Sequence, residues 1–267
     1  MTSQTAVAPS KLVIDDLTKR FALPKGEEIV AISGVSFDVK ENEVCAILGP
    51  SGCGKSTVLR MIAGLETPSS GSLKLDGRTI ERPGRDRGMV FQAYTSFDWL
   101  TVRQNVEYGM RINGIGAKER RSRAEHFINL VQLTKFADVY PSRLSGGMKQ
   151  RVAIARTLAN DPELLLMDEP FGALDAETRW HMQELLVEIA RNTSTTTIMI
   201  THDIEEAIFV ADKIVFMSRH PGRVHQIIIP EFKGGERIAD KEAVIAMDGY
   251  AELEREIMRL MRQQGGH

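Results

Sequence analysis

A glycine-rich segment between residues 49 and 56 has the residue types and spacing of a phosphate-binding loop. Gly49, Gly54, Lys55 and Ser56 form the pattern G-x-x-x-x-G-K-S. Glycines allow positive φ angles, so consecutive backbone N–H groups can turn inward and surround phosphate oxygens. Lys55 can reach the β- and γ-phosphates, and the Ser56 hydroxyl can coordinate Mg²⁺. The alternative is a glycine-rich turn that ends in Lys-Ser by chance.

The elements on either side decide between these alternatives. Residues 44–48 form a short apolar run with β-branched residues, which is typical of a buried parallel strand. Residues 58–62 continue as a helix, whose positive dipole end attracts phosphate. Strand, loop and helix together predict that the chain binds a nucleoside triphosphate.

A second apolar run delivers two adjacent carboxylates. Residues 164–167 predict a strand that ends at Asp168 and Glu169, and ligands bind at the carboxyl ends of strands in open α/β sheets. Because strand side chains alternate between faces, one acid can face Mg²⁺ and the other the attacking water. A helix cap plus a surface acid is the alternative.

Three further patterns allow both a ligand and a structural interpretation. Phe21 follows a predicted strand and is either a platform for an adenine ring or a core phenylalanine. Ser145 and the two glycines after it begin a helix, as an anion site or a simple N-cap. His202 follows a β-branched strand over residues 195–201 and can contact a γ-phosphate, although a lone histidine is usually structural.

The remaining pattern predicts an α/β domain with a helical insertion. Strands are expected over residues 11–21, 28–33, 35–39, 72–76, 77–80, 88–92, 213–218 and 223–229, and helices over residues 176–191, 203–211 and 241–262. Residues 93–159 have a helical pattern, and their basic cluster fits a solvated helix face better than a binding patch. Residues 1–10 are expected to be a disordered tail.

Composition limits the classes of function. Lys and Arg number 34 and Asp and Glu 36, a net charge of -2, which gives no electrostatic footprint for nucleic acid or an anionic membrane. No apolar run is long enough to cross a bilayer, and the N-terminus does not have the pattern of a signal peptide. The two cysteines fit a reducing cytoplasm. We expect Cys45 to be buried on its strand and Cys53 to be the more reactive thiol, because nearby amide dipoles favour its thiolate.

Taken together, these motifs resemble the ATP-binding subunit of ABC transporters from residue 11 to about residue 229. The matching motifs are the Walker A loop at 49–56, the Q-loop Gln92, the signature LSGGMKQ at 144–150, the Walker B strand at 164–169, the D-loop at 173–175 and the switch histidine His202. Phe21 takes the place of the A-loop aromatic residue. Residues 91–106 resemble importers of the nitrate, sulfonate and taurine type, with Asp98 where those usually carry proline.

The resemblance implies a P-loop NTPase fold. This fold has a RecA-like α/β core with an antiparallel β-subdomain, here over residues 11–92 and 160–230. An inserted α-helical signature subdomain would cover residues 93–159, and a C-terminal helical tail residues 231–267.

The resemblance also implies a head-to-tail dimer that sandwiches two Mg-ATP molecules. Glu169 would polarise the attacking water, and Lys55 and His202 would contact the γ-phosphate. The implied nucleotide-binding residues are Phe21, Gly49, Pro50, Ser51, Gly52, Cys53, Gly54, Lys55, Ser56, Thr57, Gln92, Ser145, Gly146, Gly147 and Asp175. The implied magnesium site consists of Ser56, Gln92 and, in its outer shell, Asp168.

Three classes of function fit these motifs. The first is a transporter motor on the cytoplasmic face of the inner membrane, importing a small anion with permease subunits and, indirectly, a substrate-binding protein. The second, a soluble ABC ATPase of DNA repair or translation, is disfavoured by length and by near-neutral charge. The third, a cassette that only binds ATP, is disfavoured by the presence of Lys55, Glu169 and His202.

Large apolar side chains directly follow Gln92. They are Tyr94, Phe97, Trp99 and Leu100. Such a cluster predicts a groove that receives a short permease helix, and the alternative is the core of the helical subdomain.

Overall fold

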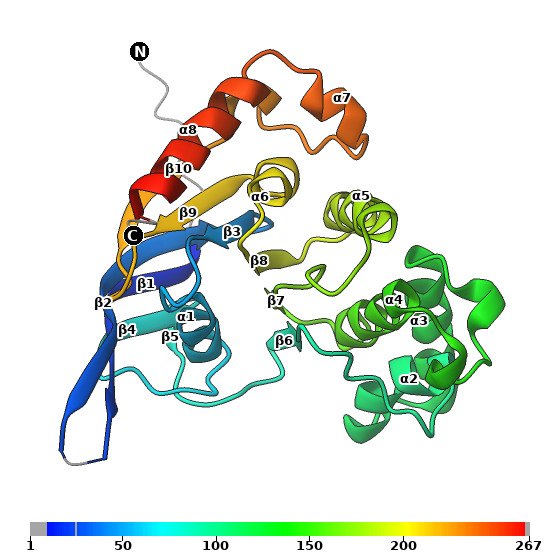
Figure 1. Cartoon of the computed structure of the whole chain (residues 1–267). Coiled ribbons are helices and arrows are strands. Elements are labelled where there is room, and N and C mark those ends of the chain that lie inside the picture. The colour runs from blue at the N-terminus through cyan, green and yellow to red at the C-terminus, as the bar shows by residue number, and fades with distance from the viewer. Residues whose placement is uncertain (1–9, 25, 265–267) are drawn as a thin grey trace, which may run out of the picture.

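Two β-sheets form the framework of the fold. The computed structural model describes residues 10–24 and 26–264, and Figure 1 shows the arrangement of their elements. Of the predicted tail over residues 1–10, residues 1–9 lie outside the described part, and Ser10 already begins the first strand.

The larger sheet has six strands in the order β10-β9-β3-β8-β7-β6. Neighbouring strands are parallel except for β10, which pairs with β9 in the antiparallel sense, as the predicted hairpin requires. The strands are β3 (Val44–Leu48), β6 (Arg87–Val90), β7 (Leu164–Asp168), β8 (Thr196–Thr201), β9 (Lys213–Met217) and β10 (Val224–Ile228). The carboxyl ends of the parallel strands therefore meet at one edge, where ligands bind in such sheets.

The smaller sheet is antiparallel, with strand order β2-β1-β4-β5. Its strands are β1 (Ser10–Ala22), β2 (Glu28–Lys40), β4 (Ser70–Leu75) and β5 (Arg78–Thr79). The two strands predicted over residues 28–33 and 35–39 are one strand, so this prediction is wrong. Gly34 adopts a φ of +66°, and the pairing of β1 with β2 is irregular beside it, so the chain bends without leaving the sheet.

Eight α-helices surround the sheets in the described part of the chain. They are α1 (Lys55–Ile62), α2 (Val102–Ile112), α3 (Ala117–Leu130), α4 (Gly146–Leu158), α5 (Ala176–Asn192), α6 (Ile204–Val210), α7 (Lys241–Ile245) and α8 (Tyr250–Gln264). Short 3-10 turns occur at Thr134–Phe136, Pro141–Arg143 and Glu231–Lys233. No helix of the described residues has both the length and the apolar content needed to span a bilayer.

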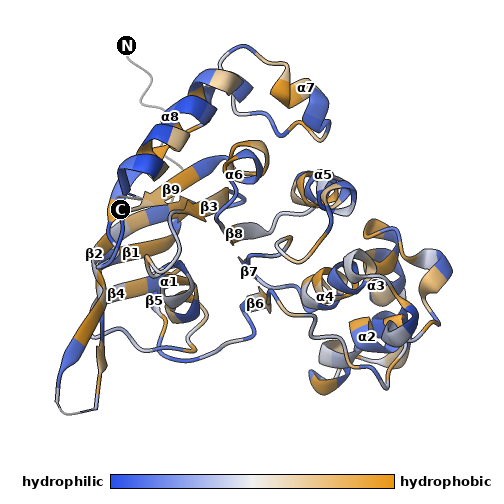
Figure 2. Cartoon of the chain, in the orientation of Figure 1, coloured by the Kyte–Doolittle hydropathy of each residue, from blue (hydrophilic) through white to orange (hydrophobic). Residues whose placement is uncertain are grey.

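Strand β3 separates two hydrophobic cores because its side chains alternate between its faces. Cys45 and Ile47 face a core that contains α1 and the antiparallel sheet, whereas Val44, Ala46 and Leu48 face a core that contains the other helices. Figure 2 shows the contrast between the hydrophobic residues of β3 and the mostly hydrophilic residues of α8. The apolar run at 44–48 thus positions the phosphate loop by being buried on both sides.

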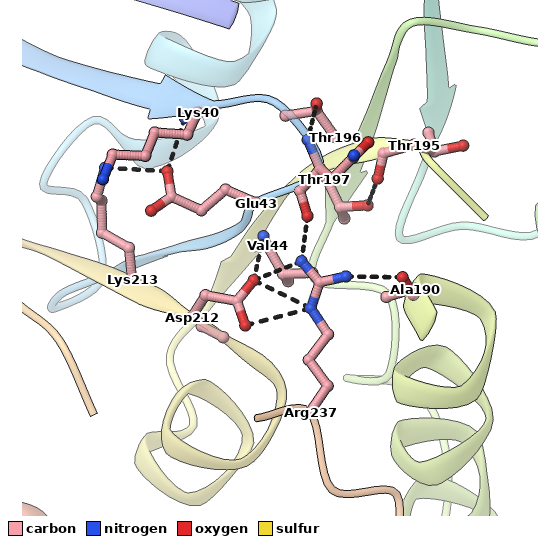
Figure 3. Close-up of polar contacts among 12 residues, drawn as sticks. Lys40, Glu43, Val44, Ala190, Thr195, Thr196, Thr197, Asp212, Lys213 and Arg237 are labelled. Carbon is pink, nitrogen blue, oxygen red and sulfur yellow. Dashed lines mark hydrogen bonds and ion pairs between the residues drawn. The ribbon is translucent and has the colours of Figure 1, made fainter. Parts of the chain in front are cut away.

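The C-terminal segment is anchored to the end of the sheet opposite the phosphate loop. Arg237 makes a bidentate ion pair with Asp212, with an Nη2–Oδ2 distance of 2.6 Å, and donates to Ala190 O at the end of α5 (Figure 3). Asp212 also accepts from Val44 N at the start of β3. The single helix predicted over residues 241–262 is divided into α7 and α8, because Gly249 takes a φ of +97°.

Candidate hydrolysis site

The phosphate loop lies between β3 and α1, as the sequence predicts. Gly52 and Gly54 have φ angles of +77° and +92°, in the left-handed region that glycine tolerates best. Gly54 is also the N-cap of α1, and it offers no side-chain cap to the first N–H groups of the helix. These N–H groups and the positive end of the helix dipole are suited to bind an anion.

Lys55 places a positive charge inside the curve of this loop. Its side chain is buried, and Nζ donates to Gly49 O at 2.8 Å and to Pro50 O at 3.1 Å. The amine is thus held by the same loop whose N–H groups would surround a phosphate chain, so loop and charge form one anion site.

Four strands bring the predicted polar residues together at the carboxyl edge of the sheet. Ser56 Oγ, at the start of the helix after β3, donates to Asp168 Oδ1 at 3.2 Å. Gln92, which follows β6, donates from Nε2 to Glu169 Oε2 at 3.5 Å. His202 Nδ1, which follows β8, lies 3.2 Å from the same carboxylate oxygen. Glu169 is therefore the residue at which the Q-loop and the switch histidine meet.

The backbone separates the two adjacent acids. Glu169 has a φ of +44°, a conformation that non-glycine residues rarely adopt and that is concentrated at functional sites. Its N–H donates to Ile200 O at 3.1 Å, and its carbonyl oxygen accepts from Gly172 N at 3.2 Å. The turn directs Glu169 toward Gln92 and His202 while Asp168 pairs with Ser56, so the two acids have different contacts.

The donor set at Ser56 and Asp168 fits a magnesium ion. Burial raises the pKa of Asp168, although the hydrogen bond from Ser56 acts to lower it. The protein alone therefore disfavours the charged form of this carboxyl group. A divalent cation would offset this cost, and hydroxyl and carboxylate oxygens are the ligands that Mg²⁺ prefers.

Phe21 lies at the exposed end of β1. Its side chain is 36% exposed, and Lys19 Nζ lies 4.9 Å from the ring centroid. Phe21 is therefore not a core phenylalanine, and an aromatic face remains at the surface of the sheet that flanks the phosphate loop.

The signature and the D-loop form helix N-caps away from the phosphate loop. Ser145 Oγ accepts from Met148 N at 3.3 Å, and Asp175 Oδ1 accepts from Thr178 N at 3.0 Å. The latter bond lowers the pKa of Asp175. Figure 1 shows α4, which begins at Gly146, well apart from α1. The structure thus does not bring the signature residues to the phosphate loop of the same chain.

The prediction that the loop favours the thiolate of Cys53 is wrong. Its side chain is fully buried in the core beneath the loop, and this burial raises the pKa of the thiol despite the nearby charge of Lys55. Cys45 is buried on β3 as expected, and burial raises its pKa as well. The amide dipoles of the loop do not compensate for desolvation, because the sulfur points to the core.

The structure has a groove beside β6, α2 and α4, but only one side chain of the predicted apolar cluster lines it. A cavity of about 520 Å³ is lined by Phe97, but not by Tyr94, Trp99 or Leu100 among the described residues. Tyr94 instead lies against Gly146 at the signature turn. Tyr108 and Ile112 contribute to the groove without having been singled out in the sequence. Their i, i+4 spacing on α2 is the signal that could have identified them.

Two polar side chains, buried Asn105 and half-buried Arg156, fix the chain segment beside this groove. Asn105 is fully buried, accepts from Phe97 N, and donates to the carbonyl oxygens of Phe97, Leu100 and Thr101. Arg156 donates to the carbonyl and hydroxyl oxygens of Thr95, each at 2.7 Å, and its guanidinium lies 5.1 Å from the Phe97 ring centroid. The segment after Gln92 is therefore held in one conformation from both sides.

Comparison with known proteins agrees with this geometry. A family model described as ABC transporter matches residues 32–172. The nitrate import ATP-binding protein NrtD of Synechocystis sp. is 47% identical over 225 residues, which are 84% of this chain and 84% of that protein. The taurine import ATP-binding protein TauB of Jannaschia sp. is 41% identical over 250 residues, 94% of this chain and 93% of that protein.

A solved structure has the same fold. The dimeric ATP-binding cassette MJ0796, in a post-hydrolysis state bound to ADP and Pi, superposes with a TM-score of 0.71 at 34% identity, covering 82% of this chain and 98% of that one. The predicted P-loop NTPase fold is confirmed. Because the family model covers more than half of the chain and both relatives match along most of their length, the chain belongs to the ABC transporter family, as an ATP-binding subunit that hydrolyses ATP to drive transport.

Proposed function

We propose that the chain is the motor subunit of an importer for a small anion, working on the cytoplasmic face of the cell's inner membrane. The names of its relatives support import, since they refer to nitrate and to taurine. The observation that supports the catalytic assignment is the contact of one carboxylate, Glu169, with both Gln92 and His202.

The roles of the residues follow from their positions. Glu169 orients and polarises the attacking water, and His202, 3.2 Å from its carboxylate, contacts the γ-phosphate. Lys55 and the N–H groups of the loop bind the phosphates, and Phe21 stacks on the adenine. Ser56, Gln92 and Asp168 would hold Mg²⁺, which supplies charge neutralisation at the phosphate oxygens.

The second half of the site comes from a second copy of the chain. Ser145, Gly146 and Gly147 stand at a helix N-terminus, but α4 lies apart from α1 within one chain (Figure 1). Two copies placed head to tail would present each signature turn to the phosphate loop of the other, enclosing the γ-phosphate between two helix N-termini. The dimeric cassette among the solved structures supports this arrangement.

The groove beside Phe97 is the docking site for a cytoplasmic helix of the permease. Its apolar side chains include Phe91, Phe97, Tyr108 and Ile112, and Ile112 is 68% exposed. An amphipathic helix would bury these side chains in the helix-in-groove manner. Because Gln92 lies between the groove and Glu169, nucleotide hydrolysis and permease movement are linked over a few residues.

Substitution of Glu169 tests the catalytic assignment. Glu169→Gln keeps the side-chain shape and removes the charge, so we expect ATP to bind with little change while turnover falls by at least about a hundredfold. The variant should accumulate as an ATP-bound dimer in size-exclusion chromatography. Glu188→Gln, at an exposed position of α5, is the matched control and should keep the parent rate. Parental turnover in Glu169→Gln would exclude this residue as the catalytic base.

A further inference from the structure

A small cavity lies directly behind the hydrolysis site. Its volume is about 40 Å³, which is room for more than one water molecule. Its walls include Glu169, Arg179, Thr201, His202, Asp203 and Glu206. The cavity therefore connects the proposed catalytic pair with two charged side chains, Arg179 and Glu206, to which the sequence assigns no role.

Two buried atoms in these walls have no hydrogen-bond partner among the described residues. They are Oε1 of Glu206 and Nε of Arg179. Glu206 is only 4% exposed. Buried polar groups are nearly always hydrogen-bonded, so an unpaired acceptor and an unpaired donor on two residues that line one polar cavity point to an ordered water between them.

Arg179 joins the D-loop to the loop that carries the switch histidine. Its Nη2 donates to Leu174 O in the D-loop at 2.9 Å. Its Nη1 lies 3.8 Å from Asp203 Oδ2, in the residue after the switch histidine. A shift of the guanidinium would therefore move the D-loop and the His202 loop together.

We propose that Glu206 is a positioning residue for ATP hydrolysis: through ordered water in this cavity, its carboxyl group holds Arg179, and Arg179 fixes the D-loop and the His202 loop. The inference rests on the proposed roles of Glu169 and His202. It assigns to Glu206 no contact with the nucleotide.

The surroundings of Glu206 determine its charge. Asp203 faces it from the start of α6, Arg179 from α5, and Glu169 and His202 from across the cavity. Gln183 Nε2 donates to Glu206 Oε2 at 3.4 Å, and Lys241 of α7 donates to Gln183 Oε1 at 2.9 Å.

More distant charged or titratable groups also contact α6. Lys241 lies 3.6 Å from Glu205, Lys233 binds the carbonyl oxygens of Phe209 and Ala211 at the end of the helix, and Tyr250 of α8 interacts with Glu205 and Asp203.

Burial, assisted by Asp203, raises the pKa of Glu206 to about 8. At neutral pH the carboxyl group is therefore protonated and uncharged. It can share a hydrogen-bonded water with the Arg179 guanidinium without pulling the guanidinium toward itself by charge attraction. Once ionised, the carboxylate would draw the guanidinium away from Leu174 O and add a negative charge opposite Glu169. Both effects disturb the arrangement in which hydrolysis occurs.

The test compares the pH dependence of steady-state ATP hydrolysis by the full chain and by Glu206→Gln, which mimics the protonated carboxyl group. For the parent we expect kcat to fall about tenfold between pH 7 and pH 9, as the protonated fraction falls, with little change in KM. Glu206→Gln should keep kcat within about twofold at pH 7 and lose this decline. Glu205→Gln, at the exposed carboxylate of the preceding residue, should keep the parental profile.

A parental pH profile in Glu206→Gln would overturn the proposal. If Glu206→Gln does not fold, Arg179→Lys tests the same arrangement, because it keeps the charge and removes the Nε donor. We expect a fall in kcat of about tenfold at constant KM, and an unchanged kcat would overturn the proposal. These outcomes are separate from failure of the proposed base, which would appear as parental turnover in Glu169→Gln.

Discussion

Single residues in this protein are constrained by what lies directly against them, and Gly222 is an example. Its N–H donates to Ala31 O at 3.0 Å, and its carbonyl oxygen accepts from Ser33 N at 2.9 Å. A Cβ at this position would overlap the carbonyl oxygen of Cys53 in the phosphate loop. The loop over residues 218–222 therefore supports the phosphate loop from behind.

We expect Gly222→Ala to weaken ATP binding by about tenfold or more, because Cys53 and the loop around it must move. Titration with a fluorescent ATP analogue measures this effect. Gly116→Ala is the matched control, since a Cβ at Gly116 meets no atom within 4 Å. Equal ATP affinity in both variants would show that the phosphate loop does not depend on this contact.

At the same scale, the sequence predicts which residues meet but not where each side chain points. Gln92, Glu169 and His202 could be placed together because they follow strands whose carboxyl ends share one edge of a parallel sheet. The direction of the Cys53 side chain could not be predicted, because the direction of a side chain within a loop depends on φ angles that the spacing of glycines does not specify. Arg179 and Glu206 were missed because their importance arises from a cavity between two helices and a loop.

At the scale of elements, one arginine connects the C-terminal segment to the sheet. Arg237 pairs with Asp212, donates to Ala190 O at 2.7 Å and to Asn42 O, and so joins α5, β3 and β9 (Figure 3). Its side chain is 19% exposed, so removing it leaves a largely buried Asp212 carboxylate without its partner.

Arg237→Ala is expected to lower the free energy of unfolding by about 3 kcal/mol. Hydrogen exchange in α7 and α8 should accelerate more than exchange in β3, because the anchor of the segment is lost. Urea denaturation and exchange measured by mass spectrometry test this prediction. Arg259→Ala, on the exposed face of α8, is the control, and a similar loss there would contradict the role of the anchor.

Glu206 of helix α6 makes the stability of the folded protein depend on pH. Glu206 has a pKa raised from 4.5 to about 8 in the folded chain. The folded state therefore binds more protons than the unfolded state between these values, and the stability that Glu206 contributes is present in full below pH 4.5 and falls as pH rises toward 8. Glutamine has no proton to lose.

The free energy of unfolding of Glu206→Gln should therefore exceed that of the parent increasingly between pH 5 and pH 8, by about 3 kcal/mol over this range. Urea denaturation at several pH values measures the difference between the two proteins. Lys233, whose pKa is lowered to about 8 by burial, affects both proteins equally and cancels in the comparison. A difference that does not vary with pH would show that Glu206 is not buried in its protonated form.

The elements themselves were largely predictable from hydrophobic patterns. The buried run at 44–48 and the acidic end of the strand at 164–168 are both strands as expected. The errors lie at glycines. Gly34 keeps β2 continuous through a bulge, and Gly249 divides the C-terminal helix, because each adopts a positive φ that sequence alone leaves undetermined.

At the scale of the whole molecule, the segment after Gln92 faces two different partners. Phe97 lines the groove proposed for the permease, whereas Tyr94 packs on Gly146 at the turn proposed to meet the second copy's nucleotide. The sequence placed both side chains in one cluster because they are three residues apart. The loop between them turns, held by Arg156 at Thr95 and by Asn105 at Phe97.

This separation predicts opposite phenotypes for two neighbouring substitutions. Phe97→Ala should retain ATP hydrolysis by the isolated subunit and lose most association with the permease, because the groove loses one of its aromatic side chains. Tyr94→Ala should retain the association and reduce ATP-induced dimerisation, since Gly146 loses the side chain that supports it. Co-purification with the permease and size-exclusion chromatography with ATP measure the two properties separately. If both variants lose permease association equally, the groove and the signature turn form one surface, and the docking site extends across both.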